Sequence, residues 1–182
     1  MPPERRPLDG SAPDRREAQK VSATASDGQH LWYSVINLGT EGPGVDARIV
    51  RRDLASRTDD VVHELTMGLG EVPGALAAFD DTLVWSIAGS SPHLVVSDGE
   101  QILGEVPTDA LSWRALHVGP GLIGFGDSPD AEARSEGRMR LLDRGRNVLV
   151  ELGGSCCPRV LVAGPYVVWD DGNDYRRGTM RS

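Results

Sequence analysis

The chain has few cysteines, few aromatic residues and no long apolar run. Its two cysteines, Cys156 and Cys157, are adjacent, so they cannot build an ordinary framework of intrachain disulfides. We interpret them as two small apolar side chains at a strand start, with a strained vicinal disulfide as the rarer alternative. No histidine lies within local ligand spacing of the pair, which disfavours a metal site there. Cysteine usage therefore leaves the redox compartment, and the localisation, undecided.

No apolar run approaches the ~20 residues needed to span a bilayer as a helix. Residues 1–20 are rich in proline and charge and have no apolar segment, so they do not resemble a signal peptide. We expect them to form a disordered lead-in. The net charge of −8 disfavours nonspecific binding to nucleic acid or to anionic membranes, which need clustered Lys and Arg.

A helical period of 3.6 residues is also missing, since no stretch keeps it for three turns. The nearest candidate, residues 74–79, is short and lies tightly between Pro73 and Asp80-Asp81. From Val21 onward the chain consists of short apolar runs separated by Gly, Pro, Asp and Ser, which is typical of strands and turns. A length of 182 residues favours one domain, and we expect it to be all-β.

What the chain does have is a repeat. Residues 49–53, 94–98 and 139–143 are each predicted to form a short strand closed by an aspartate, and Asp53, Asp98 and Asp143 are spaced 45 positions apart. A period of roughly 40–50 residues built only of strands is typical of a β-propeller, with one blade per repeat. The sequence therefore predicts a propeller.

Each repeat is expected to contain four strands. The first strands are predicted at residues 20–25, 75–79, 113–118 and 160–163, and each is followed by a turn and a strand that is apolar on both faces. The third and fourth strands alternate, so Val61, His63 and Leu65 should share one face. The approximate blades are 21–70, 71–110, 111–155 and an incomplete 156–182.

This gives about three and a half four-stranded blades, fewer than the usual 4–8 of a closed ring. An open arc leaves unpaired edges and two exposed blade faces, which favours association. We expect either that the chain is a fragment of a longer propeller or that it closes a ring by oligomerising.

Residues 25–34, Ala-Ser-Asp-Gly-Gln-His-Leu-Trp-Tyr-Ser, resemble the opening of a TolB-like, WD-repeat-related propeller repeat. The later copies are degenerate, because Asp80-Asp81-Thr82 lacks the glycine and the third and fourth copies use Gly-Pro turns. The resemblance covers residues 20–175 as a pattern of blade construction. It implies a propeller, often extracytoplasmic, that binds proteins or accompanies a hydrolase domain, and it transfers no catalytic residue.

Two motifs suggest cofactors but fit turns better. Gly119-Pro120-Gly121-Leu122-Ile123-Gly124 matches G-x-G-x-x-G, yet an apolar strand follows it where a dinucleotide site needs a helix. We interpret these glycines as a tight turn and as relief of crowding on inner strands. Residues 170–174 are rich in oxygen ligands but lack the closing glutamate of a calcium loop. We therefore expect no cofactor and no metal.

Acidic residues recur in the turns before the second strands and in the loops after them. The acids of these loops should lie on one face of a propeller, where they could favour a basic partner or a cation; a solvated surface is the plain alternative. The histidines give fewer candidate binding residues, because His30, His63 and His93 fall in predicted strands. Only His117 ends a first strand near the axis. The candidate binding residues are Asp27, Asp80, Asp81, His117, Asp127, Asp130, Asp170, Asp171 and Asp174.

No G-x-S-x-G nucleophile elbow is present in the sequence. We therefore expect a noncatalytic propeller segment that recognises a protein or a small ligand. The alternative is an accessory propeller of a prolyl-oligopeptidase-like serine hydrolase whose catalytic domain lies beyond this chain. A small propeller lyase or glycosidase is a third hypothesis, which needs carboxylates or histidines clustered at the axis.

Overall fold

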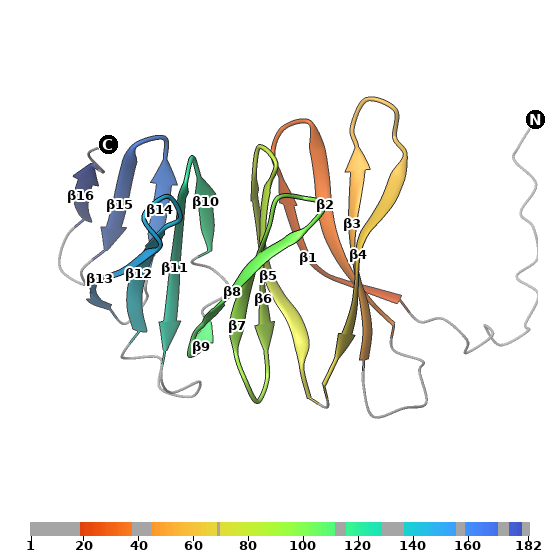
Figure 1. Cartoon of the computed structure of the whole chain (residues 1–182), viewed down its shortest axis with the longest axis horizontal. Helices are drawn as coiled ribbons and strands as arrows, with labels where there is room; N and C mark the ends of the chain where they lie inside the picture. Colours follow the sequence, from red (N-terminus) through yellow and green to blue (C-terminus); the bar gives the residue numbers. More distant parts are fainter. Residues whose placement is uncertain are drawn as a thin grey trace, which may run out of the picture.

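The computed structural model describes residues 19–37, 45–68, 70–111, 116–128, 137–155, 159–170 and 175–179. These residues form four consecutive antiparallel sheets, each a simple meander in which neighbouring strands along the chain pair with one another (Figure 1). The fold is all-β and forms a partial propeller, as the sequence predicts.

Sheet 1 contains β1 (Gln19–Ser26), β2 (His30–Asn37), β3 (Val45–Asp53) and β4 (Asp59–Met67). Sheet 2 contains β5 (Val72–Phe79), β6 (Thr82–Ala88), β7 (His93–Ser97) and β8 (Ile102–Pro107). Sheet 3 contains β10 (His117–Gly119), β11 (Leu122–Ser128), β12 (Gly137–Asp143) and β13 (Val148–Ser155), and the two-residue β9 (Ala110–Leu111) also pairs with β11. Sheet 4 contains β14 (Val160–Ala163), β15 (Tyr166–Asp170) and β16 (Tyr175–Thr179).

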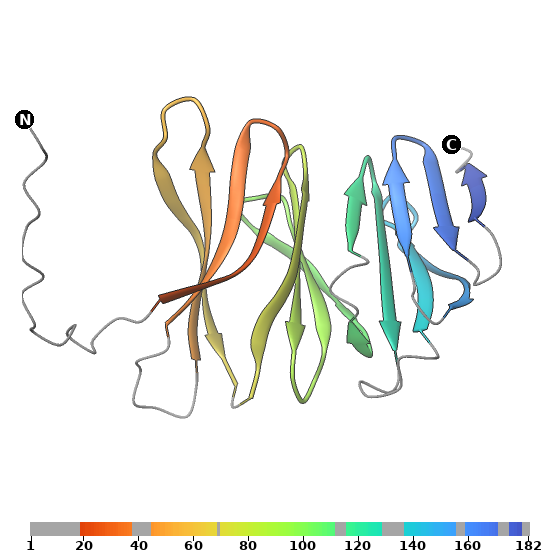
Figure 2. The ribbon, with the colours of Figure 1, turned by 180° about the vertical axis from the view of Figure 1, so that it is seen from behind.

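The first strands of the four sheets stand side by side. β1 contacts β5, β5 contacts β10, and β10 contacts β14, so these strands form the inner row of the arc (Figure 2). The predicted strand over residues 113–118 is only partly observed, because β10 begins at His117 and residues 112–115 lie outside the described part of the chain. β9 occupies the preceding stretch and pairs with Asp127 and Ser128 at the far end of β11.

Burial is highest on the second strands of sheets 2 and 3, as expected for strands with a sheet on either side. Residues 83–87 of β6 and 122–127 of β11 are all buried, whereas β8 is mostly exposed. Apolar side chains from facing sheets form three cores, one at each junction between sheets. One of the two tryptophans of the first core, Trp85, is 1% exposed and stacks against His63, with ring centroids 5.0 Å apart.

The glycines of the G-x-G-x-x-G stretch have a packing role. A Cβ on Gly119 would lie 2.6 Å from Cγ1 of Val162, and one on Gly124 would lie 2.5 Å from Cγ1 of Val160. Sheet 4 therefore packs closely against the inner strands of sheet 3 because these positions have no side chain. This agrees with the interpretation from the sequence, in which glycine relieves crowding.

One predicted register is wrong. The pairing of β3 with β4 shifts between Ile49 and Val50, which places a β-bulge at Val62. A bulge turns the following residues to the opposite face. Val61 is consequently 49% exposed while His63 is 9% exposed, so the two do not share a face.

Candidate functional site

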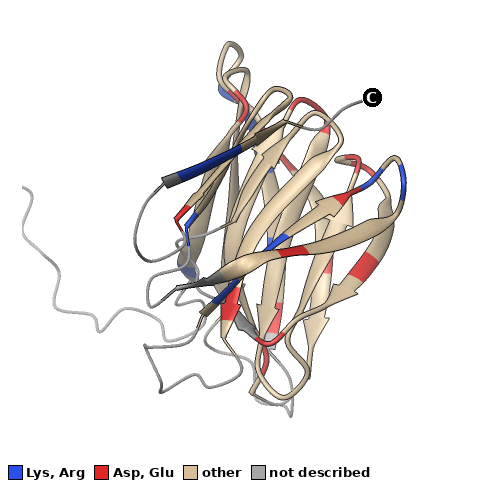
Figure 3. Ribbon diagram, turned by 90° about the vertical axis from the view of Figure 1, so that its left-hand side faces the viewer, with Lys and Arg blue, Asp and Glu red and all other residues tan. Residues whose placement is uncertain are grey.

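The two ends of the arc differ in the connections that they carry. At one, here called the turn end, lie the tight turns β1–β2, β3–β4, β5–β6, β7–β8, β10–β11, β12–β13 and β14–β15. At the other, the loop end, lie the β6–β7 connection and the ends of β2 and β11. Acidic residues occur at both ends (Figure 3).

The predicted site residues divide between these ends. Asp27, Asp80 and Asp81 lie in turns at the turn end, whereas Asp127 and Asp170 lie near the loop end, where β11 and β15 finish. Asp130, Asp171 and Asp174 lie outside the described residues, as do Cys156 and Cys157. The two groups of candidates are thus separated by the length of the strands and do not form one site.

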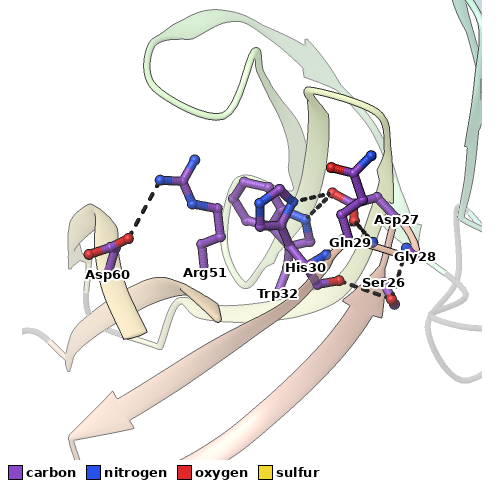
Figure 4. Close-up of polar contacts among 8 residues, drawn as sticks. All are labelled: Ser26, Asp27, Gly28, Gln29, His30, Trp32, Arg51 and Asp60. Atoms are coloured by element: carbon purple, nitrogen blue, oxygen red, sulfur yellow. Dashed lines mark hydrogen bonds and ion pairs between the residues drawn. The ribbon is translucent and has the colours of Figure 1, made fainter. Parts of the chain in front are cut away.

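Asp27 organises the β1–β2 turn. Its Oδ1 accepts hydrogen bonds from the backbone amides of Gln29 (2.8 Å) and His30 (2.6 Å). Its Oδ2 accepts from Nδ1 of His30 (3.0 Å) and from Nε1 of Trp32 (3.1 Å) (Figure 4). Burial alone would raise the pKa of this carboxyl, but these hydrogen bonds outweigh burial and hold the pKa at about 2. One ionised carboxylate therefore fixes both a histidine and a tryptophan.

The side chains fixed by Asp27 line a cleft between sheets 1 and 2. The cleft has a volume of about 330 Å³ and is open to solvent at the turn end. Sheet 1 contributes residues from β2 and β3, and sheet 2 contributes its two turns. The lining residues are His30, Trp32, Arg51, Asp81, Asp98, Gly99 and Glu100.

The lining is predominantly acidic. It has three carboxylates, on Asp81, Asp98 and Glu100, against the single guanidinium of Arg51. Arg51 is also engaged outside the cleft, because its Nη2 lies 3.6 Å from Oδ2 of Asp60 while its Cζ lies 5.8 Å from the Trp32 ring centroid (Figure 4). The cleft therefore has a net negative charge next to a tryptophan, a combination suited to a cationic group.

The repeated aspartates that define the 45-residue period close turns at this same end. Oδ1 of Asp53 accepts from the amides of Ala55 and Ser56, Oδ1 of Asp98 from those of Glu100 and Gln101, and Oδ1 of Asp143 from that of Arg146. Such side chain to backbone bonds stabilise turns. These bonds hold the pKa values of Asp53 and Asp98 below the usual range. The repeat is therefore a structural signal.

Asp80 also has a structural role. It lies between the paired residues Phe79 and Thr82 and has φ of +47°, a left-handed conformation that aspartate tolerates better than most residues. Its neighbour Asp81 is exposed and lines the cleft. The turn thus uses one acid for its backbone and presents the other to the cleft.

His117 lies on the inner strand β10 and is half-buried; its burial lowers its pKa. It is not among the residues that line the cleft. Asp127 is fully buried in β11, and its burial raises its pKa, an effect partly offset by the Arg140 guanidinium. Oδ2 of Asp127 lies 3.1 Å from Nη2 of Arg140 and accepts from the Asp109 amide at 3.0 Å. This places Asp127 in an ion-pair network that joins β9 to β11 and β12.

Several cleft residues were not among the predicted site residues. In the sequence, His30 falls in a predicted strand, Asp98 marks the repeat, and Arg51 and Glu100 have no distinguishing context. The available signal was the Asp27–His30–Trp32 spacing, which places three side chains with polar groups within one turn and the strand after it. The sequence did not show that the turns of sheet 2 face this group.

The shape of the chain is shared with two solved structures. A computationally designed protein, Ika4, is 13% identical, with a TM-score of 0.51 over 89% of this chain and 92% of its own. An oligogalacturonate lyase solved in complex with manganese is 15% identical, with a TM-score of 0.53 over 84% of this chain. The alignment spans 46% of the lyase chain, less than half its length. At these identities the likeness concerns the fold alone.

At the level of sequence, no protein-family description and no curated protein matches the chain. Within the described residues, no group of three or more His, Cys, Asp or Glu side chains is arranged to hold a metal ion. The same part of the chain contains no helix long and apolar enough to cross a membrane.

Proposed function

We propose that this chain is a noncatalytic propeller segment that recognises a protein or small ligand through the cleft between sheets 1 and 2. The observation that carries the proposal is the cleft itself, which combines a histidine and a tryptophan fixed by Asp27 with three carboxylates. A preorganised polar lining reduces the entropy lost on binding.

The composition of the lining supports binding over nucleophilic catalysis. None of the seven lining residues is a serine, threonine or cysteine that His30 could activate. The partial propeller and the resemblance of residues 25–34 to TolB-like repeats support a recognition role of the kind that this family implies. Propellers place binding residues in the turns and loops at the ends of their strands, and the cleft lies in such a place.

The test is selection of ligands on the intact chain, by panning a random-peptide display library and measuring the affinity of the selected peptides. Glu100→Lys reverses a cleft charge, whereas Glu105→Lys makes the same change on the exposed strand β8, outside the cleft. We expect Glu100→Lys to weaken binding about tenfold, by exchanging attraction for repulsion, and Glu105→Lys to leave it unchanged. Equal binding by the two variants would contradict a role for the cleft.

The second candidate is an accessory propeller of a prolyl-oligopeptidase-like serine hydrolase. The observation that favours it is the partial arc of sheets, which a longer chain would extend. An activated ester separates the candidates: full-length gene product that hydrolyses the ester, with the 182-residue chain inert, would favour the hydrolase.

A further inference from the structure

Turn-end positions in sheets 1 and 3 can be matched by their backbone bonds. The amide of Leu54 donates to the carbonyl of Gln29 in sheet 1, and the amide of Arg144 donates to that of Gly121 in sheet 3. Leu54 and Arg144 each follow a repeat aspartate directly. In sheet 2 the residue after the repeat aspartate is Gly99, whose amide donates instead to Oγ of Ser97. Gly99 therefore corresponds to Leu54 and Arg144 by its place directly after the aspartate.

At the junction of sheets 2 and 3, this position provides a long side chain. Nη1 of Arg144 reaches back to sheet 2 and donates a 2.6 Å hydrogen bond to Oγ1 of Thr82. Thr82 is the first residue of β6, as His30 is the first residue of β2. A guanidinium therefore bridges sheets 2 and 3 at the turn end.

At the junction of sheets 1 and 2, the equivalent position has no side chain. Gly99 has φ of +91°, and a Cβ there would lie 3.4 Å from both the carbonyl oxygen of Asp81 and Cη2 of Trp32. His30 stands where Thr82 stands in sheet 2. The cleft is thus the space that an arginine bridges at the next junction.

From this equivalence we infer that the cleft binds the arginine side chain of a peptide or protein partner. The inference rests on the proposed function, because it names the chemical group recognised at the same site. The carboxylates of Asp81, Asp98 and Glu100 would pair with the guanidinium, and Trp32 also lines the cleft. A planar, weakly hydrated guanidinium suits such a site better than a compact ammonium group does.

The test is a titration of the intact, isotope-labelled chain with Nα-acetyl-arginine amide, followed through the backbone amide resonances of Gly99, Glu100 and Asp81. The matched lysine amide keeps the positive charge without the planar guanidinium, and the citrulline amide keeps the planar shape without the charge. Together they show whether binding requires a guanidinium. We expect saturable shifts with arginine and affinity lower by about fivefold for lysine and about tenfold for citrulline. Equal affinity for all three would overturn the inference.

Substitutions in the cleft test whether the arginine group binds there. Asp81→Asn and Glu100→Gln each remove one cleft carboxylate, and we expect each to weaken arginine binding about threefold, as for partly exposed charge pairs. Glu105→Gln is the matched control and should leave the affinity unchanged. Asp98 is left intact because its carboxylate closes a turn. Wild-type affinity in the Asp81→Asn/Glu100→Gln double variant, with native amide dispersion, would also overturn the inference.

The outcomes separate the inference from the proposed function. Library peptides that shift the cleft resonances without containing arginine would refute the inference and leave the proposed function standing. If neither arginine amide nor any selected peptide shifts them, both are refuted.

Discussion

At the scale of single residues, Asp27 is the side chain on which the cleft depends. Its two oxygens accept four hydrogen bonds, from the amides of Gln29 and His30 and from the His30 and Trp32 side chains. Hydrogen bonds to a charged acceptor are stronger than those between neutral groups. The Asp27 carboxylate thus stabilises the β1–β2 turn.

We expect Asp27→Asn to destabilise the fold by about 1–3 kcal/mol, because the amide lacks the charge that stabilises four donors. Denaturant unfolding at pH 7 measures this free energy. Asp81→Asn, in the corresponding turn of sheet 2, is the control and should cost less than about 0.5 kcal/mol, since Asp81 is exposed.

The same carboxyl gives a pH signature of defined sign. Because its pKa falls from 3.8 in the unfolded chain to about 2 in the fold, its stabilisation is complete above pH 3.8 and is lost as the pH falls towards 2. The loss is on the order of 2 kcal/mol. In Asp27→Asn this part of the loss of stability at low pH should be absent. If the variant lost as much stability between pH 3.8 and 2 as the wild type, Asp27 would not be the group responsible.

At the scale of elements, the bulge in β4 determines the junction between sheets 1 and 2. It turns His63 inward, where its Nε2 lies 3.0 Å from Oγ of Ser97 and its ring stacks on Trp85. Oγ of Ser97 also accepts from the amide of Gly99, a residue that lines the cleft. A buried histidine thus connects the strand β4 to the turn that forms one wall of the cleft.

Burial lowers the pKa of His63, with the Asp98 carboxylate partly opposing the effect. The unfolded chain therefore takes up the proton at a higher pH than the fold does, so stability is complete above about pH 6.5 and declines as the pH falls below it. We expect His63→Phe, which can keep the contact with Trp85, to reduce this decline when unfolding is measured at pH 7.5 and 5.5. His117, whose pKa burial also lowers, should account for part of what remains.

A slope between pH 7.5 and 5.5 that is the same in His63→Phe and wild type would show that this histidine is not the group that titrates. Amide dispersion at pH 7.5 provides the control for folding of the variant.

Much of the element level could be predicted from the sequence. The 45-residue spacing and the short apolar runs were sufficient for the all-β propeller class. The register of β4 was not predictable, because a bulge is a property of the pairing with β3 and leaves the apolar alternation of Val61, His63 and Leu65 intact in the sequence.

The cleft was missed for a different reason. It is assembled from two sheets, and one of its lining residues is a glycine, Gly99, which no search for reactive residues would select. Of the predicted binding residues, Asp27 and Asp81 lie at the cleft. The roles of the predicted set in binding remain proposals.

At the scale of the whole molecule, the arc has two outer faces. On β14 and β15, Val160, Val162, Val167 and Trp169 pack against sheet 3, so Leu161 and Val168, which alternate with them, face away. Leu161 is 50% exposed and Tyr166, on the same face, is 40% exposed. Contiguous exposed apolar side chains mark surfaces that bind a partner. On the outer face of sheet 4, Cζ of Arg177 also lies 4.2 Å from the Tyr166 ring centroid.

We propose that this face of sheet 4 binds the outer face of sheet 1 in a second copy, which continues the stacking of sheets within the chain. That face of sheet 1 carries the exposed Val61 and Asp59, whose Oδ2 already lies 3.3 Å from Nη1 of Arg52 and would be shared with Arg177 in the assembly. Sedimentation or light scattering at increasing concentration should show association. Leu161→Lys should weaken it at least about tenfold through loss of apolar burial and charge repulsion. A well-folded monomer at every concentration would contradict the proposal.

The aspartate turns also bear on how such a chain can grow. Each of Asp53, Asp98 and Asp143 caps its turn with amides from the next three residues, without help from another sheet. A 45-codon segment that encodes one sheet therefore also encodes the aspartate that stabilises its own turn. Tandem duplication of this segment in the gene would yield a sheet with a complete hairpin turn. After duplication, substitutions at the residue that follows the aspartate, now leucine, glycine or arginine, would change the space between adjacent sheets. The hairpin that all copies share would be retained.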